Sequence, residues 1–142
     1  MSIVDDLLKK YPNDLKVVIK SFPLGFHKQA KKAAQYWLAA DKQGKGDEMY
    51  RKIFDNFRQL KSNEDLPVDY AKEFGLDLDK FKADANSPSI ISRIDREMNE
   101  FRSAGFPRQS VPKFLIQGKE PSGRRSVEGY SEIINAELEK LK

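Results

Sequence analysis

Two short apolar segments that favour β-strands limit the folds open to this chain, because long stretches with helical periodicity lie between them. The first, residues 15–22 (LKVVIKSF), is rich in β-branched side chains and ends at Pro23. The second, residues 114–116, follows Val111 and Pro112. Strand segments separated by helices are typical of α/β layouts, so we predict an α/β fold with a large helical part.

The helical stretches are marked by apolar residues at spacings of three and four. We predict helices over residues 3–11, 27–42, 49–60, 67–74, from 78, 88–104 and 130–141. Asp77 and Ser87 suit N-caps, and Pro88 suits the first helical position. A turn over 117–123 followed by a short strand over 124–126 would complete a hairpin. We expect the aromatic residues of these helices to be core residues: Trp37, Phe54, Phe57, Phe74, Phe81 and Phe101.

Size and charge exclude several classes of function. The 142 residues fit one domain, 1–142, and 26 basic against 22 acidic residues give a formal charge of +4. Because acids and bases are interleaved, we expect no nucleic-acid partner. No segment has the length of apolar sequence that crosses a membrane, and the first residues lack the pattern of a secretory signal. As written, the sequence predicts a soluble, cytoplasmic chain without a membrane partner.

The residue types needed for several kinds of catalysis are missing. The sequence has no cysteine and one histidine, His27, so we predict no disulfide, metal site or cofactor and assign no catalytic residue. Spacing around Ser21 and Ser110 identifies no triad. His27 fits a partly exposed residue at a helix start better than a proton carrier.

Two charged groups have a functional and a structural interpretation. Arg124, Arg125 and Ser126 would suit an anion or phosphorylation site, but a solvated hairpin accounts for them. Acidic residues near helix starts resemble paired carboxylates, and capping accounts for them. These acids are Glu64, Asp65, Asp77 and Asp79.

Three segments in order resemble the DsbA-like thiol:disulfide oxidoreductases of the thioredoxin superfamily. They are VDDLLKKYPNDLKVVIKSFPLGFHKQAKKAAQYWLAA at 4–40, EFGLDLDKFKAD at 73–84 and SVPKFLIQG at 110–118. The resemblance spans nearly the whole chain and implies a thioredoxin-like fold with a helical insertion at about 27–104. It also implies that the chain starts inside the first helix, without the preceding strand and the Cys-x-x-Cys pair.

The missing strand has a structural consequence. The resemblance places it between the strand at 15–22 and the strand that begins near Lys113, so unpaired strand edges would remain. We expect the sheet to close by direct pairing of these two strands. Alternatively another chain supplies an edge, and a homodimer would then form through the exposed strands.

The missing cysteines lead to the functional expectation. Thiol exchange needs a thiolate and a resolving thiol, so we expect these residues alone to be inactive, as a truncated or redox-inactive family member. A periplasmic parent is what the resemblance implies for location. The alternative is a peptide-binding or assembly module, since Pro112 resembles the family's cis-proline and Val111 would offer its backbone to an extended peptide or protein substrate.

Overall fold

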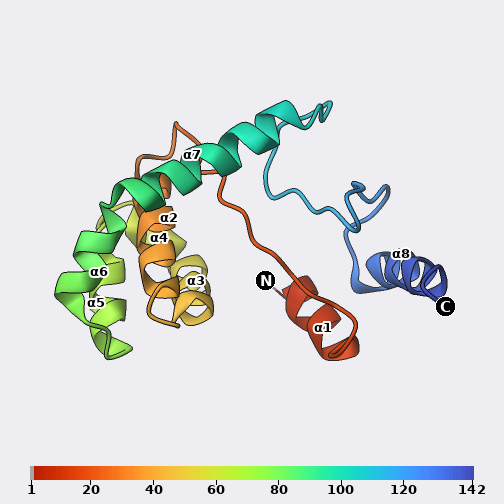
Figure 1. The fold of residues 1–142 in the computed structure, drawn as a ribbon, viewed down its shortest axis with the longest axis horizontal. Coiled ribbons are helices and arrows are strands. Elements are labelled where there is room, and N and C mark those ends of the chain that lie inside the picture. The colour runs from red at the N-terminus through yellow and green to blue at the C-terminus, as the bar shows by residue number, and fades with distance from the viewer. Residues whose placement is uncertain (1) are drawn as a thin grey trace. The chain divides into compact units, whose positions relative to one another are not determined.

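The computed structural model describes residues 2–142 and places eight helices in that part of the chain. Their bounds are α1 Ser2–Lys10, α2 Lys28–Asp41, α3 Gly46–Asp55, α4 Phe57–Leu60, α5 Leu66–Glu73, α6 Leu78–Ala85, α7 Pro88–Ser103 and α8 Val127–Glu139 (Figure 1). The chain forms two compact units. We call Lys20–Gln109 the helical unit, and residues 1–19 together with 110–142 the terminal unit.

Helix α2 is the centre of the helical unit. It packs against α3, α5, α6 and α7, and small side chains on its buried face allow these close approaches. Ala39 and Ala40 are fully buried, as is Ala71 of α5 opposite. Alanine also has the highest helix propensity, so the same residues favour the helix and its packing.

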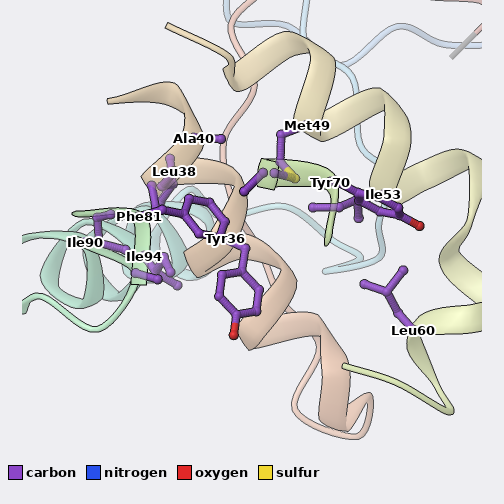
Figure 2. Packing of buried hydrophobic residues seen from close by; sticks show 13 residues of the cluster. Tyr36, Leu38, Ala40, Met49, Ile53, Leu60, Tyr70, Phe81, Ile90 and Ile94 are labelled. Atoms are coloured by element: carbon purple, nitrogen blue, oxygen red, sulfur yellow. The ribbon is translucent and has the colours of Figure 1, made fainter. Parts of the chain in front are cut away.

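The core of the helical unit gathers large side chains from five of its helices around α2 (Figure 2). Phe81 and Met49 are fully buried and Leu38 is 1% exposed. The ring of Phe81 stacks on that of Tyr36 with centroids 5.3 Å apart. Burying each large side chain contributes about 1.5–3 kcal/mol, which explains why this unit forms without a sheet.

Local sequence signals set several helix ends as the sequence predicted. The Asp77 carboxylate accepts a hydrogen bond from the backbone N–H of Lys80, and the Ser87 hydroxyl accepts one from Ile90. Gly75 has a φ of +69° just after α5, a conformation that glycine adopts without strain. These caps satisfy backbone groups that would otherwise lack partners at the helix ends.

An extended segment at the start of the helical unit is fixed along α7. The backbone N–H of Ser21 donates to Glu97 Oε2 at 2.6 Å, and Glu97 is only 6% exposed. The ring of Phe22 packs on Phe101 with centroids 4.5 Å apart, and Lys20 pairs with Glu100. The carboxylate of Glu97 therefore satisfies one backbone N–H, that of Ser21, in a segment that was expected to be a strand.

The terminal unit has a smaller core between α1 and α8. It consists of Leu7, Tyr11, Tyr130 and Ile134, with partly buried side chains from the connecting segments around it. The Ser126 hydroxyl caps α8 by accepting from the backbone N–H of Gly129 at 3.0 Å.

The predicted α/β fold was wrong. Among residues 2–142 there is no sheet, and the one β-bridge joins Ile116 to Lys119. After α1 and the turn at 11–14, residues 15–22 lie outside any helix or strand. The same is true of residues 113–115. Because a strand exists only when another strand supplies its hydrogen bonds, β-branched side chains alone did not produce one. Within the described part of the chain, no backbone hydrogen bond pairs these two segments, so the expected direct pairing was wrong as well.

Two further expectations about local structure were also wrong. Residues 124–126 form no strand, and the hairpin turn is limited to Gln117 and Gly118, whose φ angles of 48° and 78° suit a two-residue turn. Phe54 and Phe57 are 50% and 53% exposed rather than buried. Helix α3 ends at Asp55, just before the bend that carries Phe57 outward.

Candidate functional site

The segment around Val111 and Pro112, which the sequence singled out, is an exposed loop of the terminal unit. The Val111–Pro112 peptide bond is cis, as the family resemblance implied. Val111 is 37% exposed and Leu115 is 47% exposed. The segment therefore presents two apolar side chains to solvent within five residues.

Arg125 fixes this loop to the unit that carries it. Its Nη2 donates to the carbonyl oxygen of Pro112 at 2.8 Å, and its guanidinium lies 5.6 Å from the ring centroid of Phe114. Phe114 in turn packs on Tyr130 of α8, with ring centroids 5.6 Å apart. Burial raises the pKa of the Tyr130 hydroxyl, so this ring stays neutral under the loop.

A second interaction fixes the downstream side of the loop. The side chain of Lys113 is 6% exposed, and its Nζ lies 2.7 Å from Glu120 Oε1. Glu120 follows the tight turn in which Ile116 and Lys119 exchange two backbone hydrogen bonds, of 2.9 and 3.1 Å. The turn thus places the carboxylate where the lysine can reach it.

The backbone of this loop offers unused hydrogen-bonding groups. Within the described chain, no hydrogen bond uses the N–H or C=O of Val111, Phe114 or Leu115. Exposed backbone groups of this kind can bind an extended peptide by strand addition, with neighbouring apolar side chains contributing contact area.

The residues that fix the loop were not identified from the sequence. Arg125 and Glu120 lie in a stretch whose arginines the sequence analysis interpreted as part of a solvated hairpin. Their roles depend on contacts with Pro112 and Lys113, which no local pattern predicts. Ser126 was likewise grouped with the arginines, although an N-cap serine before an apolar helix is a recognisable signal.

One cluster in the terminal unit has the composition of a catalytic dyad. Lys10 Nζ donates to Ser131 Oγ at 2.9 Å, and the Tyr11 hydroxyl donates to Asn135 Oδ1 at 2.8 Å beside it. Ser131 is only 3% exposed, so a substrate carbonyl cannot reach its oxygen. The cluster joins α1 to α8 and is structural.

The other residues considered from the sequence fall outside any shared site. His27 is exposed at the N-cap of α2, as expected, and its ring contacts Phe26. Ser21 is buried, and its Oγ has no partner among the described residues. Across residues 2–142, no three His, Asp or Glu side chains gather as metal ligands would.

Asp65 was expected to act as a cap, and the structure gives it another role. It occupies the N-cap position of α5, but its carboxylate does not bond to the backbone there. Instead it accepts a hydrogen bond of 2.6 Å from the Tyr36 hydroxyl and pairs with Lys32 at 2.7 Å. The ammonium of Lys32 and the hydroxyl of Tyr36 hold the pKa of Asp65 below its usual value.

Comparison with known proteins places the chain in a family. The family model described as thioredoxin matches residues 2–136. The chain therefore belongs to the thioredoxin family.

The curated relative is a much longer protein. The Na(+)/H(+) antiporter NhaA of Herminiimonas arsenicoxydans is 28% identical over 132 residues, which cover 93% of this chain and 20% of the relative. The chain thus spans about a fifth of that protein. No solved structure matches the chain. None of the helices among residues 2–142 has the length and apolar character needed to cross a bilayer.

Proposed function

We propose that this chain is a DsbA-like, peptide-binding member of the thioredoxin family that performs no thiol exchange with its own residues. The observation that carries the proposal is the pairing of family membership with a sequence that contains no cysteine. Disulfide exchange requires a thiolate that attacks and a thiol that resolves the mixed disulfide. Without either group, these residues can bind a polypeptide substrate but cannot exchange its disulfides.

The binding surface is the loop that contains Val111 and Pro112. Its unused backbone groups would pair with an extended polypeptide, and the exposed side chains of Val111 and Leu115 would contact the peptide. Arg125 and Glu120 hold the loop in place before binding, which lowers the entropy lost on association. The substrate class is therefore an unfolded or extended segment of another protein, without a requirement for cysteine.

A peptide pair would test this mode of binding. We expect an eight-residue peptide rich in valine and threonine to shift the amide resonances of residues 111–116 in a titration. The same peptide N-methylated at alternate backbone nitrogens should bind at least tenfold more weakly, because it keeps its side chains but loses donors. Leu115→Ser should weaken the unmodified peptide, and Val18→Ser is the matched control. Equal binding of both peptides would contradict backbone pairing.

A second candidate is a thiol:disulfide oxidoreductase whose cysteines lie in a longer polypeptide. The match to only a fifth of a longer relative favours it, because it shows that a segment of this kind occurs within a larger protein. Because that relative is named as an antiporter, the longer polypeptide would be one in which this domain is joined to an ion antiporter. The protein made from its native gene should then be heavier than 16.3 kDa and contain two titratable thiols. A 16.3 kDa species without thiols would leave the binding module.

A further inference from the structure

A small basic hollow lies on the helical unit, and its lining includes Lys32 and Tyr36, the two residues that bond to Asp65. Its volume is about 270 Å³, just below the range of sites for drug-sized ligands. Its walls come from the first half of α2, the segment before α5 and the end of α6. The residues that matter for its chemistry are Lys28, Lys31, Lys32, Gln35, Tyr36 and Asn86.

The charges in this hollow are unbalanced. Lys32 pairs with two carboxylates, Asp65 at 2.7 Å and Glu64 at 3.4 Å, so one negative charge on this side of the hollow is left over. Lys28 and Lys31 are exposed and have no ion pair within the described chain. Two ammonium groups on one helix turn, three residues apart, repel each other, and an anion between them would relieve that repulsion.

The polar groups around the two free lysines are held in place. The Tyr36 hydroxyl points away from the core cluster (Figure 2) and donates to Asp65 at 2.6 Å. The side-chain amide of Gln35 donates to the carbonyl of Ala85 at 3.0 Å, and that of Asn86 donates to the carbonyl of Lys82 at 2.9 Å. Each amide keeps its oxygen for a ligand hydroxyl.

We infer that this hollow binds a small phosphate monoester. The sign of the charge fits, because such a group carries about −1.5 to −2 at pH 7, and the three ammonium groups of Lys28, Lys31 and Lys32 outnumber the two carboxylates of Glu64 and Asp65. The size also fits, because the volume accommodates a few carbon atoms beyond the phosphate but not a folded partner. The amides of Gln35 and Asn86 would bind hydroxyl groups of the esterified part, which distinguishes an ester from inorganic phosphate. This site is independent of the peptide-binding loop, which belongs to the other unit.

The test is an amide chemical-shift titration of the whole chain with three probes: glycerol 2-phosphate, inorganic phosphate and a phosphoserine peptide. We expect glycerol 2-phosphate to bind most tightly and to shift resonances of residues 28–36 and 85–86. The double variant Lys28→Gln/Lys31→Gln should bind it at least tenfold more weakly. Lys61→Gln/Lys72→Gln removes the same charge from two exposed lysines outside the hollow and should bind like the wild type.

Four results would overturn the inference. They are equal weakening by both double variants, inorganic phosphate binding as tightly as the ester, tighter binding of the phosphoserine peptide, and shifts confined to residues outside the hollow. The last readout needs only the wild-type chain, so the inference stays testable if a variant fails to fold. A circular-dichroism melt of each variant establishes that the lysine changes leave the helices intact.

Discussion

The two units of this protein differ in the size of their buried apolar cores and in how much of each unit is helical. In the helical unit a single cluster of thirteen buried residues joins helices α2 to α7. In the terminal unit the buried cluster contains four residues. Outside α1 and α8, residues 11–19 and 110–126 of this unit lie in turns and irregular segments. A helix makes its backbone hydrogen bonds internally, whereas a strand needs a neighbour. The difference teaches that helices can form a core without the help of a sheet.

The largest expected effect tests the difference in core size. Phe81→Ala should lower the free energy of unfolding by about 3–5 kcal/mol, because the ring is fully buried. Leu7→Ala, in the smaller core of the terminal unit, should cost about 2 kcal/mol. Urea unfolding followed by Trp37 fluorescence reports on the helical unit, since Trp37 is the sole tryptophan. Equal shifts of the Trp37 transition in both variants would mean that the units unfold together.

The next prediction concerns the segment fixed along α7. Glu97→Gln should cost about 1–3 kcal/mol, because a buried group that bonds to Ser21 N–H and to Arg93 loses its charge. Glu100→Gln is the matched control on the same helix and should cost less than about 1 kcal/mol, since its pair with Lys20 is exposed. Hydrogen exchange at the Ser21 amide should quicken in the first variant alone. Unchanged exchange would show that Glu97 does not hold the segment.

A smaller effect compares the two units through their helix caps. Ser87→Ala and Ser126→Ala each remove a hydroxyl that accepts a backbone hydrogen bond, from Ile90 and Gly129 respectively. Each change should cost about 1 kcal/mol. Chemical denaturation with helix content as the signal measures both. A larger loss at Ser126 would indicate that the terminal unit depends more strongly on local stabilisation.

The smallest expected effect is a pH dependence of the helical unit. Burial, and then the Asp65 hydrogen bond, raise the pKa of Tyr36 from 10.0 to about 12. The unfolded chain therefore releases this proton first, and stability is complete below pH 10 and declines as pH rises toward 12. Allowing for solvent around the hydroxyl, we expect a loss of about 1 kcal/mol or less.

Absorbance at 295 nm follows the ionisation of all five tyrosines, so the difference between the wild type and Tyr36→Phe reports the titration of Tyr36. Tyr36→Phe should lose this part of the alkaline decline while keeping the part due to lysines, and it serves as the control. An alkaline decline identical to that of the wild type would contradict the assignment.

The helices could be predicted from the sequence because their signals are local. Spacing of apolar residues, the caps Asp77 and Ser87, and the glycine after α5 all act within a few residues. Whether an apolar segment forms a strand could not be predicted in the same way. Val17 and Val18 have the right side chains, but they are 39% and 67% exposed here, because strand formation depends on a distant partner.

The candidate site shows the same division. Val111 and Pro112 were proposed because residues 110–118 resemble a family signature loop, whereas the contacts of Arg125 and the pair formed by Tyr36 and Asp65 depend on side chains distant in the sequence. The sequence gives no local indication that Asp65 pairs with Lys32 rather than capping its helix. Acidic residues at helix starts have two uses, and only the packing of α2 beside α5 decides between them.

Both ends of the helical unit lie along the last turns of α7. Lys20 pairs with Glu100 at the entry of the segment, and Gln109 donates to the carbonyl of Arg102 at its exit. A stretch of chain that enters and leaves at one place can be gained, lost or exchanged in evolution without rerouting what flanks it. Residues 20–109 therefore have the arrangement of an inserted domain, whose gain or loss leaves the flanking sequence continuous.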